Sequence, residues 1–310
     1  MPDLALRPSD LEHCRALLTA GSKSFSAASR LLPRRVREPA TVLYAFCRIA
    51  DDAVDAAGVD RAAAVADLRE RLDRVYRGEP ADVPVDRALA EIVHRRGVPR
   101  ALLDALVEGM AWDADGRRYE TLDDLHAYAA RVAGTVGAMM TLLMGPRAPH
   151  VLARACDLGA AMQLTNIARD VGEDAARGRI YLPLSWLRDE GIDPDELARA
   201  PRFDPRLARV VRRLLAAADE LYARADGGVS LLPADCRVAI RAARLIYSAI
   251  GARVARAGYD SVSRRAVVPT WQKVWLLLRA LPARLTAPKP SADPPIAAAR
   301  FLVHACEPAS

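Results

Sequence analysis

A row of oxygen-bearing side chains recurs at intervals of four residues in one segment of the chain. In NIARDVGED, residues 166–174, the row consists of Asn166, Asp170 and Asp174, and it lies in a run rich in Ala, Leu and Ile. Four residues make slightly more than one helical turn, so the three side chains share one face of a helix. A structural core has no use for such a row, whereas a hard divalent cation takes oxygen ligands of this kind.

A second acidic stripe lies upstream, in YAFCRIADDAVD at residues 44–55. Asp51 and Asp55 are one turn apart on one helical face, and Asp52 lies beside them. Aspartate is a poor helix former, so three of them inside an otherwise apolar helix indicate a functional requirement.

Each acidic stripe has an arginine next to it. Arg48 lies one turn before the first stripe, Arg169 directly precedes Asp170, and Gln163 extends the second stripe by one turn. Magnesium binds through one or two carboxylates plus substrate phosphates, and arginine binds the remaining phosphate oxygens. A single pair of aspartates one turn apart is usually a solvated helix face. Two such stripes, each with an arginine, predict a magnesium-dependent enzyme that acts on an organic diphosphate and leaves a carbocation in a dry apolar pocket.

The elements that must position these residues are helices, because apolar residues recur at intervals of three and four and sustained period-two alternation is absent. Beyond the N-terminal segment, the pattern predicts helices at about 35–56, 60–77, 85–96, 99–115, 121–144, 148–175, 204–226, 233–257 and 269–284. No repeat or linker divides them. We therefore predict one all-α helical bundle over residues 1–285, with its ligand sites between facing helices. The Pro-rich segment 286–310 is predicted to be a flexible tail.

The amino-acid composition limits the kinds of molecule that the protein can bind. The 310 residues are 52% hydrophobic and carry a net charge of +6, but runs of Lys and Arg with interleaved aromatics are absent. This favours a diphosphate or an anionic membrane surface over nucleic acid. The N-terminal sequence lacks the basic and apolar regions of a secretion signal, and no uninterrupted apolar run reaches about 18 residues. We expect a cytoplasmic protein, and the scattered cysteines predict neither a zinc site nor disulfides.

Several longer motifs resemble the squalene/phytoene synthase family, the head-to-head prenyl transferases. They are GSKSF at 21–25, YAFCRIADDAVD at 44–55, VAGTVG at 132–137, QLTNIARDVGED at 163–174 and GRIYLP at 178–183, in the order expected for the family. The resemblance extends from about Gly21 to Lys273. It implies an isoprenoid-synthase-type bundle with a central cavity, in which two prenyl diphosphates condense through a cyclopropyl diphosphate intermediate.

The resemblance also implies roles for individual residues. The magnesium-binding positions, which would also accept Mn²⁺, correspond to Asp51, Asp55, Asn166, Asp170 and Asp174. The positions that contact the diphosphates or nearby substrate atoms correspond to Ser22, Lys23, Ser24, Tyr44, Arg48, Gln163, Arg169, Tyr247 and Arg264. Tyr128 matches a catalytic tyrosine close to the reacting carbons, and Phe25 would face the isoprenoid chain. Some members have a histidine where this chain has Gly21, which leaves only a backbone amide for phosphate. In VAGTVG, we expect Gly134 and Gly137 to admit a prenyl chain close to the backbone or to allow close helix packing.

The segment 258–281 resembles the phytoene-forming bacterial members more than the squalene branch. We therefore expect two geranylgeranyl diphosphates to be joined to phytoene, for carotenoid synthesis, without a nicotinamide cofactor. Squalene or dehydrosqualene formation from farnesyl diphosphate is the alternative. A head-to-tail elongating enzyme would normally carry DDxxD in each half, whereas the second stripe here begins with Asn166. A non-catalytic helical scaffold of the same fold is an alternative from another class.

Because the expected substrate and product are hydrophobic, we expect peripheral contact with the inner face of the membrane. We also expect contact with downstream carotenoid enzymes. The candidate membrane surfaces are VWLLLRAL at 274–281 and IAAARFLVHA at 296–305, whose apolar residues lie beside basic ones. The alternative is a last core helix followed by a disordered tail.

Overall fold

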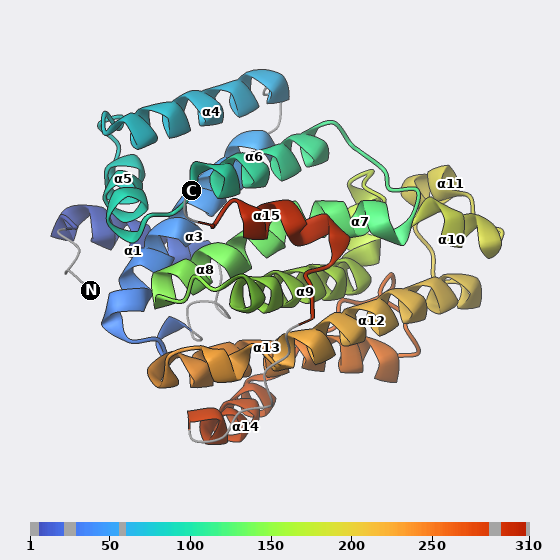
Figure 1. Ribbon diagram of the computed structural model, residues 1–310. Coiled ribbons are helices and arrows are strands. Elements are labelled where there is room, and N and C mark those ends of the chain that lie inside the picture. The colour runs from blue at the N-terminus through green and yellow to red at the C-terminus, as the bar shows by residue number, and fades with distance from the viewer. Residues whose placement is uncertain (1–5, 22–28, 56–59, 285–292, 308–310) are drawn as a thin grey trace.

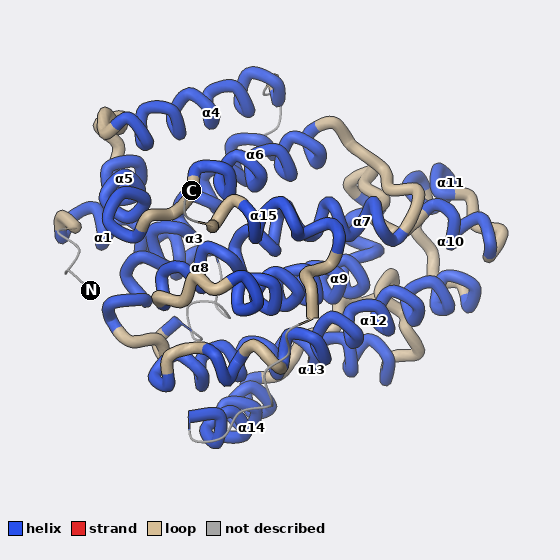
Figure 2. Tube along the Cα trace, in the orientation of Figure 1, coloured by secondary structure: helices blue, strands red, loops and turns tan. Residues whose placement is uncertain are grey.

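The computed structural model of the chain describes residues 6–21, 29–55, 60–284 and 293–307. Within these ranges every regular element is a helix (Figure 2). The predicted all-α bundle is therefore confirmed.

The helices follow one another along the chain in this order. In the first half of the chain they are α1 (Pro8–Gly21), α3 (Arg34–Asp55), α4 (Arg61–Arg77), α5 (Pro84–Arg96) and α6 (Arg100–Ala114). The centre consists of α7 (Leu122–Ala129), a π-helical turn (Ala130–Gly134), α8 (Thr135–Met144) and the long α9 (Pro149–Ala176). The second half has α10 (Leu184–Asp189), α11 (Pro194–Arg199), α12 (Pro205–Asp226), α13 (Ala234–Arg256), α14 (Thr270–Ala280) and α15 (Arg300–His304), with short 3-10 turns at Val229–Leu231, Leu281–Arg284 and Ala297–Ala299.

The predicted helix bounds agree with the structure to within one residue, except that the predicted helix 269–284 divides into α14, which ends at Ala280, and the 3-10 turn Leu281–Arg284. The agreement arises because the helix ends carry clear local signals. The side chain of Asp60 accepts hydrogen bonds from backbone amides at the start of α4, and Thr121 forms a capping box at the start of α7. Gly78 and Gly97 end α4 and α5 with positive φ, which glycine adopts without steric cost. The short helices α10 and α11 were not predicted, since six residues give too few turns for a periodic pattern.

Helix α9 runs through the middle of the bundle and packs against α8, α12 and α13 (Figure 1). Two glycines allow close approaches, one between α8 and α9 and one between α9 and the π-helical turn. A Cβ atom at Gly137 would lie 2.2 Å from the carbonyl oxygen of Ala155, and one at Gly159 would lie 2.2 Å from that of Ala133. The structure therefore shows close helix packing at Gly137, and Gly137 also lines the apolar cavity described below, so the interpretation that it admits a prenyl chain stays open.

The C-terminal segment is part of the bundle. Helix α15, red in Figure 1, packs against α8 and α9, and Leu302, Val303 and Cys306 are buried. Leu302 lies against Gly134, where a Cβ atom would be 3.4 Å from the leucine side chain. The prediction of a flexible tail is thus wrong for residues 293–307, because the apolar side chains of this short helix fill a groove on the core. The same burial removes 296–305 as a candidate membrane surface.

A buried ion-pair cluster attaches this segment to α9. Arg154 and Asp157, both essentially inaccessible to solvent, are 2.8 Å apart, and Arg224 of α12 also donates to Asp157 at 3.1 Å. Both arginines donate to the backbone oxygen of Pro294, at 3.2 and 2.6 Å. Since these charges are paired and hydrogen-bonded, burial is tolerated and the segment is held in place.

One stretch, Leu122–Met144, is long and apolar enough by composition to cross a membrane. Its most apolar window is 67% buried inside the fold, as expected for a core helix. The composition is explained by packing against α6, α9 and α15.

Candidate active site

The second acidic stripe forms the polar edge of α9, with Asp170 at its centre. The Asp170 carboxylate lies between two guanidinium groups: Arg169 Nε donates to Oδ1 at 2.7 Å, and Arg265 Nε donates to the same oxygen at 2.7 Å. A second nitrogen of each arginine donates to Oδ2, at 2.5 and 3.2 Å. Burial opposes ionisation of Asp170, but the hydrogen bonds from Arg169 and Arg265 outweigh it and lower the pKa of the carboxyl.

Arg265 reaches this carboxylate because the chain after α13 packs tightly on α9. Gly172 permits the approach: its amide donates to the backbone oxygen of Ser261 at 3.0 Å, and a Cβ atom there would lie 2.7 Å from the oxygen of Val262. The turn is fixed upstream by Asp260, whose side chain accepts from the amides of residues 262 and 263. Tyr259 adopts a positive φ of 61°, which lets the chain reverse.

This turn decides which of two adjacent arginines faces the acidic stripe. The expected diphosphate-binding residue Arg264 and its neighbour Arg265 are both exposed and both line a neighbouring cavity. Arg265 in addition pairs with Asp170 and lies 3.5 Å from Glu173. Sequence reasoning missed Arg265, because the sequence Ser-Arg-Arg carries no information about which arginine side chain reaches Asp170.

Asp174 lies one turn further along the same face. Its burial, followed by repulsion from Asp170, raises the pKa of its carboxyl to about 7, against opposing effects of Arg177 and Arg179. A partly buried carboxylate beside another carboxylate is the situation that a bound cation relieves.

The first acidic stripe lies at the C-terminal end of α3. Arg48 donates to Asp52 at 2.9 Å through Nε and lies 3.9 Å from Asp51, and both aspartates are more than half exposed. Asp55 is the last residue of this helix, and its side chain lies outside the described part of the structure.

The N-terminal motif meets α3 at Gly21. A Cβ atom at Gly21 would lie 2.5 Å from the hydroxyl oxygen of Tyr44 and 3.4 Å from Cδ of Arg48. A side chain at this position would therefore displace the tyrosine hydroxyl. Ser22, Lys23, Ser24 and Phe25 lie outside the described residues.

Two tyrosines link the acidic stripes electrostatically. Burial raises the pKa of Tyr44, which also interacts with Arg48, Asp51 and Tyr247. Burial likewise raises the pKa of Tyr247, which interacts in turn with Arg169 and Asp170. Tyr44 of α3 and Tyr247 of α13 therefore lie within electrostatic range of each other, and that the predicted residues of α3, α9 and α13 form one site stays a prediction.

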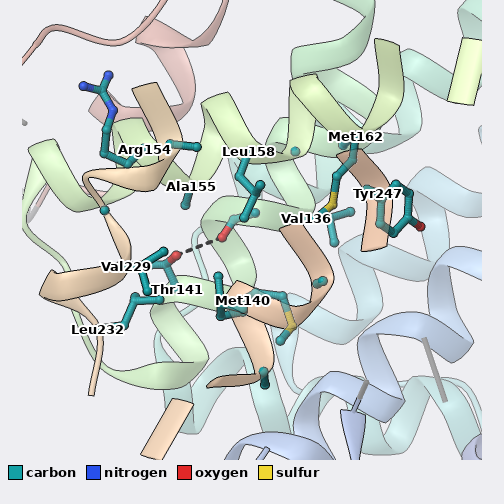
Figure 3. Close-up of a pocket in the computed structure, with 18 of the residues that line it drawn as sticks. Val136, Met140, Thr141, Arg154, Ala155, Leu158, Met162, Val229, Leu232 and Tyr247 are labelled. Carbon is teal, nitrogen blue, oxygen red and sulfur yellow. Dashed lines mark hydrogen bonds between the residues drawn. The ribbon is translucent and has the colours of Figure 1, made fainter. Parts of the chain in front are cut away.

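An apolar cavity of about 270 Å³ extends from this polar edge into the bundle, between α8, α9 and α13. Gln163, Asn166 and Tyr247 are among its lining residues, and the rest of the lining is mainly aliphatic side chains and methionines. In Figure 3, Met162 and Tyr247 lie at one end, Val229 and Leu232 at the other, and Leu158 between them. The guanidinium of Arg154 points away from the cavity (Figure 3), so only the stem of that side chain lines it.

The predicted catalytic Tyr128 belongs to a buried aromatic cluster around Asp113. Its hydroxyl donates to one carboxylate oxygen of Asp113 at 2.7 Å, and the hydroxyl of Tyr181 donates to the other at 2.8 Å. The two rings stack with their centroids 5.3 Å apart, and Tyr119 lies 5.2 Å from Tyr128. Burial keeps the pKa of Tyr128 well above its ordinary value, so the phenol stays neutral.

Sequence reasoning missed the roles of Asp113 and Tyr181 in this cluster. Tyr181 is part of the GRIYLP motif quoted above, but its hydrogen bond to Asp113, 68 residues away, has no periodic signature. Asp113 also interacts electrostatically with Asp174, which connects the cluster to the acidic stripe.

The donor set of the two stripes suits a hard cation, since it consists of carboxylate and amide oxygens. Within the described residues, no three His, Cys, Asp or Glu side chains are close enough to form a metal site. The argument that these residues could bind magnesium therefore rests on the raised pKa of Asp174 and on the fact that both stripes offer oxygen ligands. The magnesium site stays a prediction.

Comparison with known proteins gives consistent matches over most of the chain. The sequence model of the squalene/phytoene synthase family matches residues 18–272. A phytoene synthase of Rhodobacter capsulatus is 56% identical over 270 residues, which cover 86% of this chain and 80% of that protein. A phytoene synthase of Cereibacter sphaeroides is 55% identical over 287 residues, which cover 89% of this chain and 81% of that protein. A crystal structure of a dehydrosqualene synthase in complex with ligand superposes with a TM-score of 0.80 at 32% identity, covering 88% of this chain and 95% of that one.

Proposed function

The chain belongs to the squalene/phytoene synthase family, and we propose that it condenses two molecules of geranylgeranyl diphosphate head to head to phytoene, for carotenoid synthesis. It is a prenyl transferase of the phytoene synthase type. In the proposed reaction, a cyclopropyl diphosphate forms first and then ionises and rearranges, and each half-reaction releases one diphosphate.

The observation that carries the proposal is the length of the apolar cavity. The lining residues of α9 extend from Asn166 to Val151, about 22 Å at a rise of about 1.5 Å per residue. With carbon–carbon bonds of about 1.5 Å, a prenyl unit with four main-chain bonds spans about 5 Å. Four units therefore need about 20 Å and three units about 15 Å, on the same bond lengths. The stretch of α9 that lines the cavity is long enough for a C20 chain and longer than a C15 chain, which supports the proposal.

The polar edge can hold the diphosphate by charge. Arg48, Arg169 and Arg265 present guanidinium groups beside the acidic stripes, and each is already partnered with an aspartate. A diphosphate that arrives with a cation can exchange these pairs, so that the guanidinium groups donate to phosphate oxygens and the carboxylates face the cation. Asp51, Asp55, Asn166, Asp170 and Asp174 would hold magnesium, which when bound neutralises the diphosphate and makes it a better leaving group.

The lining of the cavity would surround the carbon skeleton. Because this lining is largely apolar, it disfavours water, which would otherwise capture a carbocation. Tyr128 and Tyr181 lie outside the residues that line this cavity, and their ring faces stack on each other, while Asp113 holds both hydroxyls and thereby fixes the ring positions.

A competition assay tests the substrate. Purified protein receives equimolar geranylgeranyl and farnesyl diphosphates with Mg²⁺, and the extracted hydrocarbons are separated by mass. We expect the C40 hydrocarbon to exceed the C30 hydrocarbon by at least about tenfold, because the fourth prenyl unit adds buried apolar surface. An excess of the C30 hydrocarbon would refute the C20 assignment.

Dehydrosqualene formation from farnesyl diphosphate is the second candidate. It is favoured by the superposition on a dehydrosqualene synthase at 32% identity. This reaction also needs no nicotinamide cofactor, whereas squalene formation does. Product mass with and without NADPH therefore separates all three reactions.

A further inference from the structure

The outer face of α14 and its two ends form the largest concentration of exposed apolar side chains in the described part of the chain. We call it the α14 face, and it consists of Val267, Trp271, Val274, Trp275, Leu278 and Leu281, which are 50–71% exposed. Ten large hydrophobic residues are exposed in the described ranges, and six belong to this face. Single exposed apolar residues are ordinary, but a contiguous patch indicates a binding surface.

The patch follows from the amphipathic character of α14. Trp271, Val274, Trp275 and Leu278 follow the three- and four-residue spacing of one helical face. On the opposite side, Leu276 is buried in a cluster with Ile246 and Ile250 of α13. Helix α14 thus already satisfies its core contact through one side, and the second apolar side is left over (Figure 1).

A basic groove adjoins the α14 face. This cavity of about 290 Å³ is lined by four arginines, Arg253, Arg256, Arg264 and Arg265, against one carboxylate, Asp260. Val267 lines the groove and also belongs to the α14 face, so the two surfaces are continuous. Arg253 donates to Gln272 of α14 at 3.2 Å, which fixes the groove against the helix.

The composition of the α14 face is that of a membrane interface. Its two tryptophans combine an apolar ring with a polar N–H, and such side chains favour the boundary between headgroups and acyl chains. The guanidinium of Arg279 lies over the Trp275 ring, 4.7 Å from its centroid, and the Arg279 side chain is exposed. An apolar stripe flanked by arginines is the pattern of helices that lie in the interfacial plane.

The α14 face also lies beside the candidate active site. Ile246 packs under α14 and lines the apolar cavity, and the adjacent Tyr247 does the same at the polar end. Arg265 belongs to the groove and to the ion pair with Asp170. A surface that contacts lipid here would lie next to the site at which prenyl chains are bound.

From these observations we propose that the α14 face and the basic groove dock the protein on an anionic lipid bilayer. The apolar side chains enter the acyl boundary, and Arg253 and Arg256 contact lipid phosphates. A second copy of the chain is disfavoured as the occupant, because it carries the same groove and a net charge of +6, and like charges would meet. The proposal is independent of which prenyl diphosphate is the substrate.

Co-sedimentation of the protein with lipid vesicles tests the proposal that the α14 face and the basic groove bind an anionic bilayer. The full chain is mixed with vesicles of phosphatidylcholine alone or with about a third phosphatidylglycerol, and the bound fraction is measured at two salt concentrations. We expect binding to the anionic vesicles at least about tenfold tighter than to the zwitterionic ones, and weaker at high salt. Absence of binding to anionic vesicles would overturn the proposal, and so would binding that is independent of lipid charge.

Matched variants assign the surface. Trp271→Ser with Leu278→Ser should weaken binding at least about tenfold, and Arg256→Gln about fivefold. The controls Phe203→Ser, at another exposed apolar residue, and Arg69→Gln, on α4 at the opposite side of the molecule, should leave binding unchanged (Figure 1). Circular dichroism checks that each variant is folded.

Two outcomes would contradict the assignment. If the α14 variants bind vesicles as tightly as the natural sequence, another surface docks. If the protein forms a dimer in solution that Trp271→Ser with Leu278→Ser dissociates, the α14 face is a contact between copies. Vesicle binding is measured without turnover, so its failure is distinct from a failure of the catalytic proposal.

Discussion

Substitution of Ala155 by phenylalanine should convert the cavity from a C20 site to a C15 site. Ala155 lines the cavity about 16 Å along α9 from Asn166. Three prenyl units span about 15 Å and end before this position, whereas the fourth unit passes it. A phenyl ring here fills the space of the fourth unit and leaves the space of the first three.

The magnitude follows from the apolar surface that the fourth unit can no longer bury. Five carbons at about 0.8 kcal/mol each correspond to about 4 kcal/mol. At about 1.4 kcal/mol per tenfold, this is a change of up to about 10³-fold in the ratio of kcat/KM for the two substrates. Because neighbouring side chains can adjust, we expect a shift of about 10²-fold or more.

The assay compares kcat/KM for geranylgeranyl and farnesyl diphosphates in the natural sequence, in Ala155→Phe and in the space-conserving control Ala155→Ser. General damage to the fold lowers both values and leaves their ratio unchanged, so the ratio reports the cavity. An Ala155→Phe variant with an unchanged ratio would refute the placement of the prenyl chain along α9.

Three further predictions concern the polar edge. Asp51→Ala and Asp170→Ala should each lower kcat/KM at least about 10³-fold with an unchanged circular dichroism spectrum, and near-normal turnover in either would contradict the magnesium assignment. Gly172→Ala should cost about 1–3 kcal/mol of stability and displace Arg265, so kcat/KM should fall with it; a variant with the natural melting temperature and activity would show that the close contact is unimportant. Asp174 has its pKa raised to about 7, so in the unliganded folded protein it keeps a proton that the unfolded chain releases near pH 4. Its contribution to stability should therefore be lost as pH rises from about 4 to about 7, and thermal unfolding of Asp174→Asn in chelator should lack this component.

The sequence predicted the features that depend on local periodicity. Helix bounds follow from spacing, caps and glycines, and the alignment of Asn166, Asp170 and Asp174 follows from the turn of α9 alone. A functional site at Asp51 was likewise predicted, because aspartates are unfavourable inside an apolar helix and their presence indicates a functional requirement.

Features that depend on contacts between distant segments were not predictable. The contact of Arg265 with Asp170 depends on the turn at Tyr259 and on the space left by Gly172. The burial of α15 depends on a groove formed by other helices. In both cases the local sequence allows several outcomes, and tertiary packing selects one of them.

The most direct test of the account is the mass of the hydrocarbon formed from geranylgeranyl diphosphate and Mg²⁺ without a nicotinamide cofactor. The account predicts a C40 hydrocarbon with the mass of phytoene, which disappears when the metal is chelated and returns when Mg²⁺ is restored. Hydrocarbon formation that persists in chelator would contradict the role of the acidic stripes. Absence of a C40 product, with a C30 product from farnesyl diphosphate, would contradict the proposed substrate.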